Sequence, residues 1–160
     1  MTKELIGSLA IGVVALIALV IFLSNRKLRS KQEALLAKPE DFAGSGTAGL
    51  YVSTVFTDKP LDRVWAYGLG VRGRCQIVVT DAGVGISRVG EQGLLIPAQA
   101  MVAIGLQSAT IDKGVEKNGL LAIDWQLGDS KLTTVLRIAN VQDRKKILSD
   151  VEKLIGVSVG

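Results

Sequence analysis

The stretch NVQDRKKILSDVEKLIG at residues 140–156 is where the apolar periodicity of the chain changes. Before it, apolar residues come in short β-rich runs; within it, they recur every three or four residues, as on one side of an α-helix. The apolar stripe consists of Ile147, Leu148, Val151, Leu154 and Ile155, and the polar face of Arg144, Lys145, Asp150, Glu152 and Lys153. We expect Asn140 to cap the start of this helix and Gly156 to end it. Such a helix needs an apolar surface to cover.

Seven short strands are predicted before this helix, with no other helix between them. They are expected at residues 50–57, 70–80, 84–88, 93–97, 100–111, 120–126 and 131–138. Residues 58–68 are interpreted as a loop with one helical turn, Gly73 as a bulge and residues 112–119 as a polar loop. Consecutive strands without crossover helices form an antiparallel sheet. The predicted fold is therefore mainly β: a seven-stranded antiparallel barrel or sandwich capped by a C-terminal amphipathic helix.

An apolar run lies near the N-terminus. Residues 5–23 contain no charged side chain, and at 1.5 Å per residue they span about 28 Å, close to the thickness of a bilayer's hydrocarbon core. A cleaved signal peptide normally has a shorter apolar region, followed by a small-x-small cleavage site. Here the run continues into FLSNRK without such a pair. We therefore expect an uncleaved transmembrane helix that contacts the lipid bilayer.

Basic residues follow the apolar run: Arg26, Lys27, Arg29 and Lys31. Positive charge is retained on the cytoplasmic side, so this flank predicts a single-pass protein of the plasma (inner) membrane, with its N-terminus outside and its domain in the cytoplasm. The same four side chains are candidate contacts for anionic lipid phosphates, although setting the topology is the favoured role.

Within the helix, Ser8 and Gly12 form a small-xxx-small pair that permits a weak homodimer.

The composition excludes several classes of function. Residues 1–39 hold six basic and two acidic residues, whereas residues 40–160 hold 13 of each, so the domain has no net charge to attract nucleic acid. The chain has no histidine and one cysteine, Cys75, which excludes histidine-based catalysis and histidine-based metal sites. We expect no cofactor, no metal and no enzymatic activity. The organisation predicted is an anchor at 1–25, a juxtamembrane helix and flexible linker at 26–48, a domain at 49–156 and a tail at 157–160.

Four motifs resemble those of the membrane-anchored bacterial PH-like proteins of actinobacteria. They are GLGVRGR at 68–74, VTDAGV at 79–84, IPA at 96–98 and GLLAIDW at 119–125. The resemblance covers the anchor and nearly all of residues 49–155. It implies a PH-like fold on a single-span protein, in a family often described as transporter or export proteins and without an established reaction. The dense basic motif of inositol-lipid-binding PH domains is missing, so that activity is not carried over.

These observations favour a non-catalytic module that holds an unknown protein partner at the membrane. The alternatives are an accessory subunit of a transporter or other membrane complex, and a module that binds anionic lipid headgroups. Trp65 is expected in the core, but it becomes a candidate partner contact if it is exposed. Arg72 and Arg74, two residues apart on one predicted strand face, are candidate partner or phosphate contacts.

Overall fold

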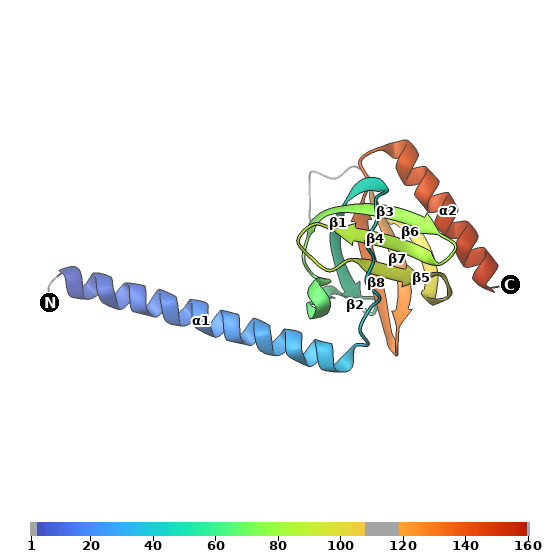
Figure 1. Ribbon diagram of the computed structural model, residues 1–160. Helices are drawn as coiled ribbons and strands as arrows, with labels where there is room; N and C mark the ends of the chain where they lie inside the picture. The colour runs from blue at the N-terminus through green and yellow to red at the C-terminus, as the bar shows by residue number, and fades with distance from the viewer. Residues whose placement is uncertain (1–2, 108–118, 160) are drawn as a thin grey trace.

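The computed structural model describes residues 3–107 and 119–159, the last three of them by their backbone only. Most of the predicted polar loop at 112–119 and the end of the strand predicted at 100–111 lie outside this part. The described elements are α1 (Lys3–Leu35), β1 (Thr47–Phe56), β2 (Lys59–Arg63), the 3₁₀ turn η1 (Ala66–Gly68), β3 (Gly73–Thr80), β4 (Gly83–Arg88), β5 (Leu94–Pro97), the 3₁₀ turn η2 (Ala98–Ala100), β6 (Met101–Gln107), β7 (Leu120–Leu127), β8 (Ser130–Arg137) and α2 (Val141–Val159) (Figure 1).

One antiparallel sheet forms the body of the domain. Its strand order is β5-β4-β3-β1-β8-β7-β6, and the short strand β2 pairs with β1 outside this path. Among the described residues β5 and β6 do not pair, so the sheet folds over into a sandwich and does not close into a barrel. The two halves enclose a core of large side chains that includes Tyr51, Leu121, Trp125 and Leu136. The predicted fold class is confirmed.

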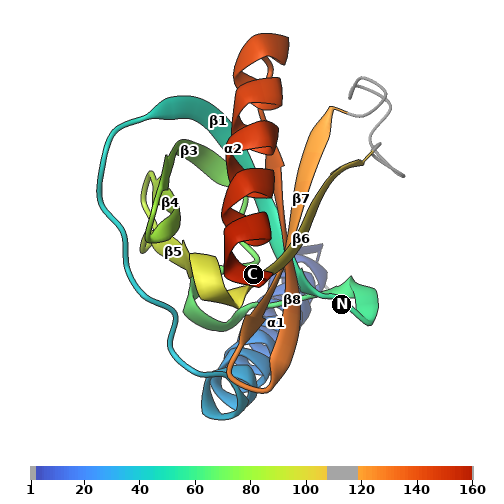
Figure 2. The same cartoon turned by 90° about the vertical axis from the view of Figure 1, so that its right-hand side faces the viewer.

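Helix α2 covers the gap between the two ends of the sheet (Figure 2). Ile147 and Val151 are buried in the core, and the other three residues of the predicted apolar stripe pack against it. The side chain of Asn140 caps the helix as expected, its Oδ1 accepting hydrogen bonds from the backbone of Gln142 and Asp143. The prediction that Gly156 ends the helix is wrong, because α2 continues to Val159.

The assignment of Arg144 to the polar face of α2 is also wrong. Its side chain is buried, and its Nη1 donates to the carbonyl of Ile138 at 2.9 Å.

Two expectations about strand geometry are corrected. Residues 58–68 contain the predicted helical turn, η1, but also the strand β2, whose five residues are all exposed and therefore give no apolar alternation. Gly73 is not a bulge: it begins β3 and pairs in register with Tyr51. The irregularities of β1 lie instead between Tyr51 and Ser53, opposite β8, and between Val55 and Phe56, opposite β2.

The segment between α1 and β1 is held against the sheet and is not the flexible connector that its glycines predicted. Glu40 forms a β-bridge with Leu95 of β5. The ring of Phe42 lies so close to Gly85 that a Cβ there would be 2.5 Å from it. The backbone nitrogen of Gly46 donates to the side chain of Gln76 at 2.9 Å. The connector therefore acts as a strap that joins α1 to the domain along a defined path.

Candidate functional site at the junction of helix α1 and the sheet

Helix α1 is long and apolar enough to cross a membrane, and it is the one such helix in the described chain. No residue of it is buried before Leu36, which directly follows it and belongs to the core. The last turns of α1 contact η1, whereas the apolar part extends away from the domain (Figure 1). The junction with the domain is thus made by the polar C-terminal turns of α1.

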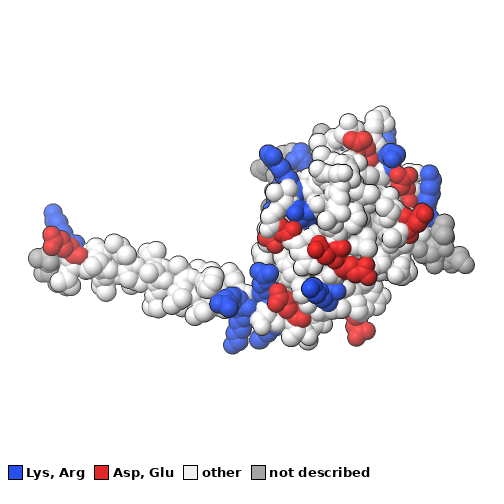
Figure 3. Space-filling view, viewed as in Figure 1, with Lys and Arg blue, Asp and Glu red and all other residues white. Residues whose placement is uncertain are grey.

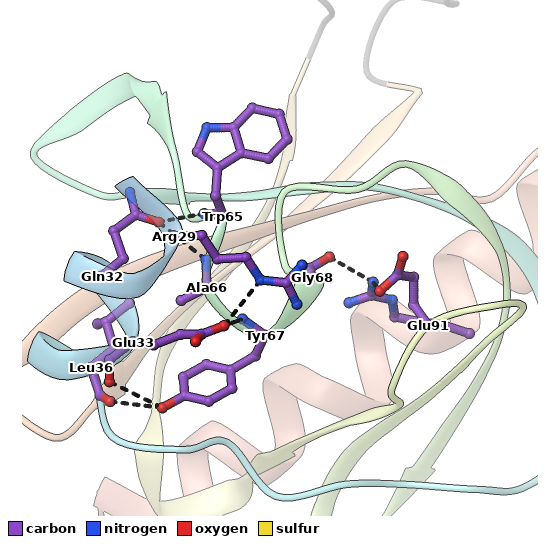
Figure 4. A network of polar contacts seen from close by, with 10 residues as sticks. Arg29, Gln32, Glu33, Leu36, Trp65, Ala66, Tyr67, Gly68 and Glu91 are labelled. Carbon is purple, nitrogen blue, oxygen red and sulfur yellow. Dashed lines mark hydrogen bonds and ion pairs between the residues drawn. The ribbon is translucent and has the colours of Figure 1, made fainter. Parts of the chain in front are cut away.

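Gln32 is the central polar residue of this junction. Its Oε1 accepts hydrogen bonds from the backbone nitrogens of Trp65 at 2.6 Å and Ala66 at 3.1 Å. Its Nε2 donates to the carbonyl of Arg63 at 3.2 Å. One amide side chain thereby binds three backbone groups from the end of β2 to the start of η1, and Figure 4 shows its contacts with Trp65 and Ala66.

Glu33 and Tyr67 make the second link. Oε1 of Glu33 accepts from Nε of Arg29 at 3.0 Å and from the backbone nitrogen of Tyr67 at 3.4 Å. The hydroxyl of Tyr67 shares its one proton between two carbonyls, that of Glu33 at 3.3 Å and that of Leu36 at 3.2 Å. These are carbonyls at the C-terminus of α1, where no further turn of the helix supplies donors. Tyr67 therefore caps α1 from the domain side.

The backbone of η1 is unusual where it receives α1. Tyr67 has a φ of 55°, a left-handed conformation that costs a non-glycine residue free energy. Gly68 follows with a φ of 70°, which glycine adopts without that cost. From inside the domain, Nη2 of the buried Arg88 donates to the carbonyl of Gly68 at 2.7 Å, and its guanidinium lies 4.3 Å from the ring centroid of Tyr51. The turn is thus held from both sides.

Tyr51 and Trp125 are buried, but Trp65 is 40% exposed, so the expectation that Trp65 lies in the core is wrong. Its indole lies against Gly70, where a Cβ would be 2.8 Å from Cε3 of the ring. The guanidinium carbon of Arg63 is 6.0 Å from the ring centroid, a distance at which a cation still interacts with an aromatic face. The exposed aromatic side chain is therefore positioned by its neighbours.

The other predicted contacts are spread over two regions. The four basic residues after the apolar run are on α1, and Figure 3 shows basic side chains grouped on the helix beside the domain. Arg29 is engaged by Glu33. Arg72 precedes β3, so it lies outside the strand on which we expected both arginines. Arg74 lies on β3 and lines a hollow of about 710 Å³ together with Arg137, and none of the described lining residues is acidic.

The two ends of the sheet differ in how they are covered. β5 is short, and its backbone is engaged by the strap, since the nitrogen of Leu95 donates to the carbonyl of Glu40 at 2.9 Å. Strand β6 spans Met101–Gln107, and none of the described backbone hydrogen bonds joins it to a second neighbour besides β7. Its Val102 is 63% exposed and its Leu106 is 38% exposed. In the described part of the molecule, β6 therefore has no second strand at its edge, and the element that packs beside it is α2.

Cys75 is buried. Burial raises the pKa of its thiol to about 11, and the nearby Arg88 guanidinium only partly opposes this effect. At pH 8 only about one such thiol in a thousand is ionised, so Cys75 is not an activated nucleophile. The described residues also contain no group of three or more metal-binding side chains.

An antiparallel sandwich, capped by a C-terminal helix and joined to an apolar N-terminal helix, defines a PH-like domain on a candidate membrane anchor. Residues 32–152 match the model of the bacterial PH domain-like family, and the chain therefore belongs to that family. The match begins at Gln32, the residue that connects α1 to the domain. No curated protein sequence matches the chain.

Proposed function

We propose that this protein is a membrane-tethered, non-catalytic interaction module that holds a protein partner at the cytoplasmic face of the inner membrane. The observation that carries the proposal is the edge of β6, at which the described residues place no second strand, whereas the opposite edge is occupied by the chain's own strap. An extended segment of a partner can add to such an edge through its backbone and gain specificity from alternate side chains. Tethering raises the effective concentration of the module for partners in the same membrane.

The chemistry of β6 indicates the kind of segment that fits. Val102 and Leu106 are exposed apolar side chains, whereas Ile104 packs against the core, and the pairing of β6 with β7 is irregular between Met101 and Ala103. A partner segment with apolar side chains that contact Val102 and Leu106 would match the exposed part of this strand. Natural sheets normally block open edges with charge, and none of the residues Met101–Gln107 is charged.

Placing lysines on this edge tests the proposal. The variant Val102→Lys/Leu106→Lys is expected to lose the proteins that co-purify with the full-length wild type from its native membrane, because charged side chains oppose strand addition. Both positions are exposed, so the thermal unfolding midpoint should change little. Val89→Lys is the matched control, since Val89 is 74% exposed and lies outside β6. Retention of the same partners by the β6 variant at wild-type yield would contradict the assignment of the edge.

An accessory subunit that acts through its transmembrane helix is the alternative. Replacing residues 1–25 by an unrelated single-span anchor distinguishes the two, because it leaves Gln32 and the junction intact. Partner capture survives the exchange if the domain is the binding module, and it is lost if the membrane helix makes the contact.

Labelling of introduced cysteines tests the orientation. In a Cys75→Ser background, Lys3→Cys and Lys145→Cys replace exposed lysines at opposite ends of the protein. A membrane-impermeant maleimide is expected to label Lys3→Cys in intact cells and Lys145→Cys only after lysis, since basic flanks remain in the cytoplasm. The reverse pattern would overturn the orientation. The native Cys75 is a poor reporter because it is buried and its pKa is raised to about 11.

A further inference from the structure

The junction sets the height of Trp65 above the bilayer. The apolar run ends at Leu23, nine residues before Gln32, so an unbroken helix places Gln32 about 14 Å above the hydrocarbon edge. The interfacial layer on each side of a bilayer is about 5–8 Å thick. A side chain that projects from the level of Gln32 back toward the bilayer therefore approaches the lipid headgroups.

Trp65 is the exposed aromatic residue at this level. Its backbone nitrogen is bound to Gln32, whereas the hydroxyl of Tyr67 is bound to the carbonyls of Glu33 and Leu36, so Trp65 lies on the side of η1 that is nearer to the apolar part of α1 (Figure 4). Tryptophan is enriched at membrane interfaces, where its apolar ring and its N–H group both find suitable surroundings. The adjacent Arg63 guanidinium supplies a positive charge for lipid phosphates.

Contacts of the domain with α1 and with the strap fix the position of Trp65 relative to the membrane helix. Gln32, Glu33 and Tyr67 join the helix to η1 by hydrogen bonds, and the strap joins the end of α1 to β5. The domain cannot rotate Trp65 away from the bilayer without breaking these contacts. This restraint distinguishes Trp65 from an exposed side chain on a freely tethered domain.

We propose that Trp65, together with Arg63, docks the domain onto the headgroup layer of the bilayer that α1 spans. The inference rests on the membrane tether of the proposed function but not on the identity of a protein partner. Docking at this point holds the domain in one orientation relative to the membrane. The β6 edge is then presented at a constant height to partners in the same membrane.

Fluorescence quenching by labelled lipids tests the docking. The full-length protein is reconstituted into vesicles of phosphatidylcholine and phosphatidylglycerol that carry a nitroxide either on the headgroup or deep in the acyl chain. We expect the headgroup nitroxide to remove the share of emission that comes from Trp65, one of the two tryptophans, and the deep nitroxide to remove much less. Trp65→Phe, which leaves only the buried Trp125, should show little quenching by either probe.

A length variant provides the matched control. Repeating residues 24–30 after Ser30 adds seven helical residues, which lifts the domain by about 10 Å and turns it by only about 20°. Quenching of Trp65 by the headgroup nitroxide should disappear in this variant. Equal quenching of the wild type and the length variant, or of the wild type and Trp65→Phe, would overturn the docking while leaving partner capture at β6 unaffected. Extraction of the wild type by alkaline carbonate would instead refute the tether on which both proposals rest.

Discussion

Removal of residues 141–160 is expected to abolish cooperative unfolding of the domain. The deletion takes away α2, whose Ile147 and Val151 are buried and whose other apolar residues pack against the core. Burial of one large aliphatic side chain contributes about 1.5–3 kcal/mol, and small domains have only about 5–15 kcal/mol of unfolding free energy in total. The measurement is the near-ultraviolet circular dichroism of the full-length protein in detergent during heating, because this signal reports the packing of Tyr51 and Trp125 and not the helicity of α1.

A matched pair of point substitutions distinguishes loss of packing from loss of chain length. Val151→Asp places a carboxylate in the core and is expected to cost about 4 kcal/mol or more. Lys153→Asp creates the same side chain two positions later at an exposed site and should change the unfolding free energy by less than about 0.5 kcal/mol. A truncated protein with a thermal transition near that of the wild type, or equal effects of the two substitutions, would show that α2 is not a structural cap.

Thr134→Val is expected to destabilise the protein by about 2–4 kcal/mol although it hardly changes the volume of the side chain. Thr134 lies in a buried chain of hydrogen bonds: Nε1 of Trp125 donates to Thr134 Oγ1 at 3.0 Å, and the hydroxyls of Thr134 and Thr54 are 2.8 Å apart. The chain continues to the hydroxyl of Tyr51, which donates to the carbonyl of Leu69 at 2.8 Å. Since Tyr51 has one proton, Thr54 must donate to Tyr51, and Thr134 must then donate to Thr54.

The substitution therefore leaves the indole N–H of Trp125 buried without an acceptor and removes the proton that Thr54 receives. Denaturant unfolding of the full-length protein measures the loss, with the exposed Thr80→Val as control. In the background of Trp125→Phe, which has no N–H group, Thr134→Val should cost distinctly less than in the wild type. An equal cost in both backgrounds would show that the hydrogen bond to Trp125 contributes nothing.

The elements with regular periodicity were predictable from the sequence, because the physical signal lies within the element itself. The apolar stripe of α2 recurs every three or four residues, and the uncharged run at residues 5–23 matches the length of a membrane span. The hairpin between β7 and β8 follows from Leu127-Gly128-Asp129-Ser130, where Gly128 adopts a φ of 59°. In each case neighbouring residues in the chain contain the information.

The candidate site was only partly predictable. Trp65 was recognised as a residue whose role depends on its exposure, and the structure places it at 40%. The role of Gln32 as a contact residue could not be predicted, because a glutamine among helix-forming residues is normally exposed to solvent. Its hydrogen-bond partners lie 31 to 34 positions away in the chain. The same is true of the strap: its glycines predicted flexibility, but its Phe42 lies against Gly85 of β4, where the absence of a Cβ leaves room for the ring.

By itself, then, the sequence determined the elements with local periodicity, the apolar anchor and the mainly β class of the domain, because each follows from the order of apolar, charged and turn residues along the chain. Only the tertiary structure decided that α1 is bound to η1 through Gln32 and Glu33, and that Arg144 is buried while Trp65 is exposed. It also decided that the strap pairs with β5, whereas within the described residues β6 pairs with β7 alone. These features depend on contacts between residues far apart in sequence. Their free energies arise only when the chain has folded and water has been removed from between the surfaces.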